Sequence, residues 1–185
     1  ALYIQNGDLT VTSGEILAIG SSGSFSLGIH VGNGTATFNG GTLLTAGCDS
    51  TSANMSFGIN SEGKITIAPN AKVAAVSGKA ASDSMAVVSE GAGMEMTGGS
   101  LLAFSGYSAS ATSTAVKAGN GDLTVSGGVL KALAGGSQGY SYGIETRDGA
   151  DTETIGSFHE SAGLVFAATG GIGVRNYAID CDGNF

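Results

Sequence analysis

Acidic side chains near the C-terminal end of the chain are the first candidates for chemistry. Asp148, Asp151 and Glu153 stand close together, and Asp180 and Asp182 form a second cluster. Carboxylate oxygens at short spacing are the hard ligands that Ca²⁺ prefers, and the second cluster has the start of a calcium-binding loop. The closing Glu of such a loop is missing. The sequence therefore favours a solvated acidic loop without a cofactor, with calcium as the one candidate ion in the alternative interpretation.

Residues for covalent or acid–base catalysis do not form a recognisable set. His30 and His159 lie far apart in the sequence, and no Cys or Asp stands at the spacing of a metal site or a nucleophilic triad. Lys117 and Glu145 occupy equivalent positions in neighbouring copies of a repeat described below, which suits a surface ion pair better than an active site. We therefore predict a protein that is not an enzyme.

Two tyrosines stand in long connections that are rich in Ser, Gly and Ala. Tyr107 lies within 105–114, and Tyr140 lies within 134–142. A tyrosine ring offers an apolar face on which a sugar ring can stack, and a hydroxyl that can form hydrogen bonds. These residues are the candidate ligand-binding side chains, and solvated turns without a ligand are the alternative interpretation.

Composition narrows the class of protein. The 185 residues include 33 Gly and only 12% charged residues, and the net charge is −8. With 7 Lys and Arg there is no basic stripe for a phosphate backbone, so nucleic acid is excluded as a partner. No run of 18 apolar residues predicts a membrane span, and residue 1 does not begin a signal peptide. Low charge with many Ser, Thr and Gly is typical of extracellular or cell-surface proteins.

A repeat of about 29 residues organises the whole chain. It is marked by six dipeptides that combine a small residue with an aliphatic one: Gly28-Ile29, Gly58-Ile59, Ala86-Val87, Ala115-Val116, Gly143-Ile144 and Ala178-Ile179. Each copy then continues through a turn, often Asn-Gly, into two further apolar segments that are separated by Gly-Gly or Ser-Gly. Alternation with period 2 makes these segments strands.

Three short strands in each copy predict an all-β fold, a single-stranded right-handed parallel β-helix with about six coils. Residues 1–185 form one domain. The aliphatic residues of the dipeptides are expected to stack inward, with Leu27, Phe57, Met85, Tyr142 and Tyr177 on the same inward face two residues earlier. The Gly-Gly pair is expected at the corner between the second and third strands.

The third strand of each copy predicts an exposed apolar stripe. Leu17, Leu44, Leu102 and Phe166 point outward if alternation holds, and a stripe of this length marks contact with another subunit or a flanking domain. The two cysteines belong to different coils. Nearly five coils of about 4.8 Å separate Cys48 from Cys181, too far for a disulfide between them; outside partners are left open.

The repeat resembles the pectate-lyase-like β-helix repeat proteins of bacterial surfaces that are described as carbohydrate-binding-domain proteins. Residues 31–46 and 119–134 carry the likeness most clearly, with units that read Gly-Ile, Leu-Thr-Ile and Gly-Gly-Thr-Leu-Thr-Ala. The resemblance implies a right-handed β-helix, an extracellular location and binding of acidic polysaccharide, sometimes with calcium. The calcium-linked members carry Asp-Asp before Gly-Ile, whereas this chain has Ser56-Phe57 and Ser141-Tyr142 at those positions.

The leading hypothesis is a non-enzymatic extracellular β-helix for adhesion or for binding of a polysaccharide or a host cell-surface glycan. A structural spacer or stalk of a surface protein is the first alternative, and a polysaccharide lyase or hydrolase is the second. The chain starts inside a repeat and stops shortly after a new dipeptide. We therefore expect it to be a fragment of a longer surface protein.

Overall fold

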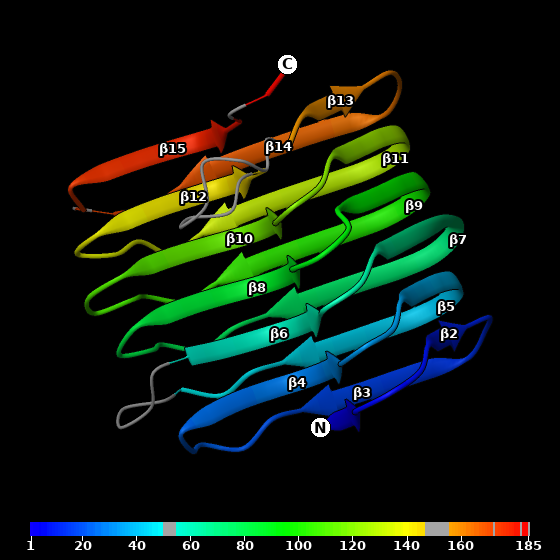
Figure 1. Ribbon diagram of the computed structural model, residues 1–185, viewed down its shortest axis with the longest axis horizontal. Coiled ribbons are helices and arrows are strands. Elements are labelled where there is room, and N and C mark those ends of the chain that lie inside the picture. The colour runs from blue at the N-terminus through cyan, green and yellow to red at the C-terminus, as the bar shows by residue number, and fades with distance from the viewer. Residues whose placement is uncertain (50–54, 147–155, 172, 182, 185) are drawn as a thin grey trace.

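The chain forms a parallel β-solenoid in the computed structural model (Figure 1). The structure describes residues 1–49, 55–146, 156–171, 173–181 and 183–184. Within these ranges the regular elements are all β-strands, and every strand pair is parallel. The described residues include no helix that is long and apolar enough to cross a membrane.

The first strand of each copy belongs to a seven-stranded sheet, which contains the small-aliphatic dipeptides. Its strands, in spatial order, are β1 (Leu2–Ile4), β4 (Phe25–Val31), β6 (Met55–Ser61), β8 (Asp83–Ser89), β10 (Thr112–Ala118), β12 (Tyr140–Glu145) and β15 (Arg175–Asp180). The register aligns Ile29, Ile59, Val87, Val116, Ile144 and Ile179 in one row. Five turns of 28 to 35 residues therefore separate Ile29 from Ile179, where the sequence predicts about six coils once the opening copy is counted.

The second and third strands of each copy form an eight-stranded sheet. In the middle copies they merge into one long strand: β5 (Ala36–Ala46), β7 (Ile65–Val76), β9 (Met94–Ser105) and β11 (Leu123–Ala134). At the N-terminal end β2 (Leu9–Val11) and β3 (Glu15–Ile19) both pair with β5, and at the other end β13 (Phe158–Glu160) and β14 (Leu164–Thr169) both pair with β11. Three separate strands per coil is therefore wrong for the middle copies.

Glycine explains how the ladder continues through the bend. The chain turns back at one edge of the sheet (Figure 1), and the pairing register shifts there, between Phe38 and Gly40 and between Val125 and Val129. Gly128 has φ +87°, and a Cβ on it would lie 2.5 Å from the carbonyl oxygen of Gly99. Only glycine meets both conditions. The predicted corner is confirmed, but it is a bulge within a strand and not a loop between strands.

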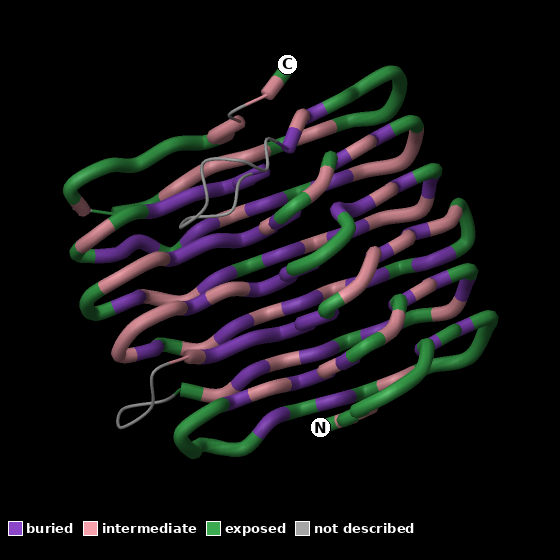
Figure 2. Tube along the Cα trace, in the orientation of Figure 1, coloured by how far each residue is buried: buried purple, intermediate pink, exposed green. Residues whose placement is uncertain are grey.

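The core is a stack of columns along the solenoid axis. Ile29, Ile59, Val87, Val116 and Ile144 are buried, as predicted. The eight-stranded sheet contributes further columns, of which Leu101, Leu123 and Leu130 are among the largest fully buried side chains. Figure 2 shows these buried positions recurring at the same place in successive coils. Burying equivalent aliphatic residues above one another supplies most of the hydrophobic stabilisation of a solenoid.

One predicted inward column faces outward instead. The dipeptides Ala86-Val87 and Ala115-Val116 both have two consecutive residues in the hydrophobic core, so alternation fails once in each first strand. The pairing register passes from Met85 directly to Val87 at this point. The side chains two residues before the aliphatic residue are therefore turned to the outer face of the seven-stranded sheet. They are Leu27, Phe57, Met85, Tyr142 and Tyr177.

A column of serines lies inside the solenoid, three residues before the aliphatic residue of each of five dipeptides. The strand register places Ser26, Ser56, Ser84, Ser113 and Ser141 in this column, and all five are fully buried. Ser113 Oγ donates to the carbonyl oxygen of Gly106 at 2.8 Å and shares a hydrogen bond of 2.8 Å with Ser105 Oγ. Ser113 thus satisfies backbone and side-chain polar groups just after the end of β9, where the strand-to-strand hydrogen bonds of the eight-stranded sheet have stopped.

The connections that follow the eight-stranded sheet also stack. Isolated parallel bridges join Ala80 to Ser108 and Ser108 to Ser137, so these loops follow one another in register along one edge, as predicted. Asn33 and Asn120 adopt positive φ values of 44° and 53°, which confirms the tight Asn-Gly turns between the first and second strands. Both Cys48 and Cys181 are free thiols, which confirms that they do not pair.

Candidate functional site

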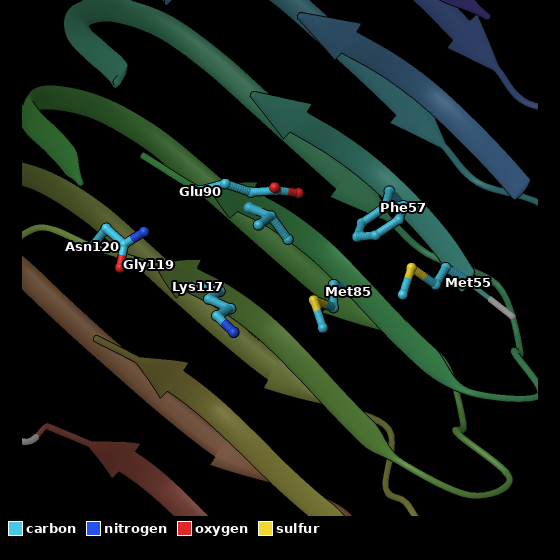
Figure 3. A pocket seen from close by; sticks show the side chains of 8 residues that line it. Met55, Phe57, Met85, Glu90, Lys117, Gly119 and Asn120 are labelled. Atoms are coloured by element: carbon cyan, nitrogen blue, oxygen red, sulfur yellow. The ribbon is translucent and has the colours of Figure 1, made fainter. Parts of the chain in front are cut away.

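The outer face of the seven-stranded sheet contains a first hollow of about 220 Å³. Met55, Phe57 and Met85 form its apolar side (Figure 3). Glu90 and Lys117 contribute a carboxylate and an ammonium group from the ends of the neighbouring strands β8 and β10. Phe57 and Met85 lie on this outer face because the small residue that follows each of them points inward. Strict alternation would have turned the small residue outward and the large side chains inward.

A second hollow of about 550 Å³ adjoins the first on the same face. Met85 and Lys117 line both hollows, so the two are neighbours on a surface that spans β6, β8, β10 and β12. Tyr140, Tyr142 and Glu145 line its far end from β12. We refer to the two hollows together as the outer groove.

Three tyrosines form a stacked ladder at this end of the outer groove. The ring centroids of Tyr140 and Tyr142 are 6.2 Å apart with an interplanar angle of 7°. Tyr142 and Tyr177, on adjacent strands, are 5.8 Å apart with an angle of 6°. Tyr142 is buried between its neighbours, whereas Tyr140 and Tyr177 are exposed. Parallel rings that support each other in this way are held in one orientation, with the rings of Tyr140 and Tyr177 left exposed.

The carboxylates of the outer groove are engaged by neighbouring side chains. Glu90 Oε1 accepts a hydrogen bond of 2.7 Å from Asn60 Nδ2. The Asp83 carboxylate accepts hydrogen bonds from the backbone N–H and the hydroxyl of Thr112, which lies on the next strand. These contacts hold both carboxylates as fixed hydrogen-bond acceptors.

Glu145 is the most deeply placed charge of the outer groove. Its side chain is only 3% exposed, and its Oε2 accepts a hydrogen bond of 3.2 Å from Thr114 Oγ1. In the strand register it lies beside Lys117 on one side and Asp180 on the other. The predicted equivalence of Lys117 and Glu145 in neighbouring coils is therefore confirmed.

The structure separates the two predicted sugar-binding tyrosines. Tyr140 begins β12 and lines the outer groove. Tyr107 lies in the connection between β9 and β10, is half-buried, and lines neither hollow; its carbonyl oxygen accepts the N–H of Ala80 at 2.9 Å. A role for Tyr107 in binding stays a prediction, and Tyr140 gains Tyr142 and Tyr177 as partners that sequence analysis placed in the core.

Most of the predicted calcium ligands lie outside the described residues. Asp148, Asp151, Glu153 and Asp182 fall in this class. Asp180 ends β15, and its carbonyl oxygen accepts the N–H of Thr146 at 3.0 Å. Across the described parts of the chain, no three His, Cys, Asp or Glu side chains are grouped closely enough to hold a metal ion. Calcium binding stays a prediction.

The predicted interface residues do point outward. Leu17 is 66% exposed and Phe166 is 51% exposed, Leu44 is also exposed, and Leu102 is half-buried. Their alternation with buried neighbours in β3, β5, β9 and β14 confirms the orientation.

Comparison of the chain with protein-family models, with curated proteins and with solved structures finds no match in any of the three.

Proposed function

We propose that this protein binds a glycan chain in the outer groove without cleaving it, as an extracellular or cell-surface β-solenoid. The observation that supports this most is the ladder of Tyr140, Tyr142 and Tyr177 beside hydrogen-bonding side chains in a hollow of about 550 Å³. Small-molecule sites have this size, with an apolar or aromatic lining and a few fixed polar groups. A sugar ring has the matching chemistry, an apolar face with hydroxyl groups at its rim.

The direction of the outer groove suits a chain rather than a single sugar. It runs across successive strands, which lie about 4.8 Å apart, so four strands offer a path of roughly 15 Å. Polar groups recur along this path, with Glu90 near the first hollow and Asp83 and Glu145 near the second. Repeated polar contacts along an apolar floor are what a polymer of similar units requires.

The charges of the outer groove favour a neutral glycan over the acidic polysaccharide that the resemblance implies. Lys117 lines the outer groove together with three acidic residues, Asp83, Glu90 and Glu145, and the whole chain has a net charge of −8. A polyanion would meet like charges at most of these positions, which costs binding free energy. Fixed carboxylates accept hydrogen bonds from neutral sugar hydroxyls without that cost.

Affinity gel electrophoresis in neutral polysaccharides and in polygalacturonate, with and without Ca²⁺, tests this proposal. We expect retardation by a neutral polysaccharide, and a loss of roughly fivefold in affinity for Tyr140→Ala, because an aromatic stacking contact contributes about 1 kcal/mol. Tyr3→Ala is the matched control, since Tyr3 is also exposed on this sheet (63% against 39% for Tyr140) but lies on β1. Tyr107→Ala tests the loop tyrosine separately.

The alternatives give different results in the same experiment. A spacer or stalk predicts no retardation by any polysaccharide, and this result would overturn the proposal. Release of unsaturated or reducing ends from the polysaccharide would identify a lyase or hydrolase instead. Retardation by polygalacturonate alone, dependent on Ca²⁺, would show that the acidic polysaccharide implied by the resemblance is the ligand.

A further inference from the structure

A broad apolar face lies on the other sheet, away from the outer groove. We define the apolar face as the outward side chains of β3, β5, β7, β9, β11 and β14, which form three columns across these six strands. The columns are Glu15, Thr42, Lys72, Ser100, Val129 and Leu164; Leu17, Leu44, Ala74, Leu102, Lys131 and Phe166; and Ile19, Ala46, Val76, Phe104, Leu133 and Ala168.

The size of the apolar face is sufficient for a specific interface. Six strands at about 4.8 Å and five residues at about 3.3 Å give a projected area of roughly 29 by 17 Å. Two such faces together bury on the order of 1,000 Å², the lower limit for a specific protein–protein interface. Leu17, Ile19, Leu164 and Phe166 are exposed large hydrophobic residues on it. A monomer gains nothing by leaving an apolar patch of this size in water.

We propose that the apolar face binds the same face of a second copy, with a twofold axis that runs parallel to the strands between β7 and β9. The solenoid axes of the two copies are then antiparallel. In this arrangement β3 faces the partner's β14, β5 faces the partner's β11, and β7 faces the partner's β9. Each column faces itself, so every residue meets the residue of its own column at the mirrored strand.

Side-chain size supports this register. Ala46 faces the partner's Leu133, and Ala74 faces the partner's Leu102, with the same pairs repeated on the other side of the axis. Val76 faces the partner's Phe104, and Ile19 faces the partner's Ala168, so a larger residue again opposes a smaller one. Leu17 and the partner's Phe166, at the edge of the face, are the exception, because both are large. Such alternation lets two flat sheet faces interdigitate at native packing density.

Charge disfavours two competing arrangements. A twofold axis parallel to the solenoid axis that passes through the Leu17 column would place each strand opposite its own copy, with Lys131 against the partner's Lys131. Moving the present axis onto β7 would place Lys72 against the partner's Lys72. Both arrangements are costly, because the two ammonium groups repel each other. With the axis between β7 and β9, Lys72 faces the partner's Ser100 and Lys131 faces the partner's Leu44.

Sedimentation of Leu44 variants tests the register directly, because Leu44 faces the partner's Lys131. We expect a dimer for the wild-type protein, a dimer for Leu44→Glu, in which the new carboxylate meets that ammonium group, and at least tenfold weaker dimerisation for Leu44→Lys. The two substitutions are matched controls for each other, since both place a charge at the same exposed position. Thermal unfolding at concentrations below dimerisation verifies that both variants fold.

Cross-linking supplies a second measurement. The pair Ala46→Cys and Leu133→Cys lies three strands apart within one chain, roughly 14 Å, which is beyond the limit of about 7 Å between Cα atoms for a disulfide. Oxidation of this double variant, with Cys48 and Cys181 replaced by Ser, is expected to give a covalent dimer, whereas either single variant in the same Cys48→Ser/Cys181→Ser background gives none. A monodisperse monomer at about 100 μM would overturn the proposal, and so would equal dimerisation of Leu44→Glu and Leu44→Lys or the absence of the cross-link.

Discussion

The buried serine column gives a sharp test of what holds each coil closed. Ser113 and Ser141 occupy the same position in adjacent coils, and both are fully buried. Ser113 Oγ has two hydrogen bonds, one to the Gly106 carbonyl oxygen and one to Ser105 Oγ. Ser141 Oγ has no hydrogen-bond partner among the described residues. The two hydroxyls therefore differ in hydrogen bonding while their burial is the same.

Replacing each serine by alanine is expected to change stability in opposite directions. Ser113→Ala leaves the Ser105 hydroxyl and the Gly106 carbonyl oxygen each without a partner in a buried place, which lowers the free energy of unfolding by about 2–3 kcal/mol. Ser141→Ala removes a buried hydroxyl that gains nothing in the folded state, which raises the free energy of unfolding by roughly 1 kcal/mol.

Thermal unfolding followed by circular dichroism measures both effects. For a chain of this length each kcal/mol shifts the midpoint by about 2–4 °C, so Ser113→Ala melts well below the wild-type protein and Ser141→Ala slightly above it. The double variant Ser105→Ala/Ser113→Ala should lose less than the sum of the single losses, because it removes both ends of one hydrogen bond. Equal losses for Ser113→Ala and Ser141→Ala would show that the column stabilises the fold by packing, and the hydrogen-bond argument would be refuted.

Three further predictions concern other parts of the chain. The Asp8 carboxylate accepts hydrogen bonds from the backbone N–H of Thr35 and, secondly, from its hydroxyl, and these hold the pKa of Asp8 below its usual value of 3.8. The ionised carboxylate therefore stabilises the fold at pH values above 3.8, and this contribution is lost as the pH falls through the lowered pKa. An NMR titration of Thr35→Ala is therefore expected to show the pKa of Asp8 raised part of the way toward 3.8, and an unchanged pKa would contradict this assignment. Leu130→Ala removes a fully buried side chain of the central columns and should lower the free energy of unfolding by about 2–5 kcal/mol in chemical denaturation; a loss below about 1 kcal/mol would mean that the coil collapses around the cavity. Cys48 and Cys181 are both expected to react with a thiol reagent in the unreduced, denatured protein, and a protected pair would contradict their separation along the solenoid.

The solenoid could be predicted from the sequence because its main determinant is a spacing. Ile29 and Ile59 lie 30 residues apart and Val87 follows after 28, and stacked coils require this regularity whatever the local conformation. The outward orientation of Leu17 and Leu44 followed from strict alternation within a short strand, which the structure keeps there.

The outer groove could not be predicted, because alternation fails where it matters. Two consecutive inward residues at Ala86 and Val87 reverse the side chains before them, so that Phe57, Met85 and Tyr142 line a groove instead of filling the core. The sequence does contain a sign of the failed alternation, because a small residue precedes the aliphatic one in every dipeptide. Two adjacent inward positions have room for only one large side chain, so the first must be Gly or Ala.

The serine column was missed for a different reason. A pattern of apolar residues predicts the core, and serine does not contribute to such a pattern. Serines such as Ser113 also do not stand out, because the chain is rich in serine throughout. Five successive copies nevertheless have Ser three residues before the aliphatic residue of the dipeptide, at Ser26, Ser56, Ser84, Ser113 and Ser141. Alignment of the copies on that residue would have revealed a buried polar column.

The two edges of the solenoid differ in how well they tolerate insertions and deletions. At the Gly-Gly bulges the strand pairing resumes directly after a local shift of register, so an inserted residue would disturb pairing with the coils above and below it. The stacked connections at the opposite edge are joined by isolated bridges such as that of Ala80 to Ser108, and Ser110 and Ala111 of one connection form part of the wall of the larger hollow. Lengthening or shortening that connection would therefore change the wall of the outer groove while the two sheets stay the same, which makes this edge the place where the groove can vary most.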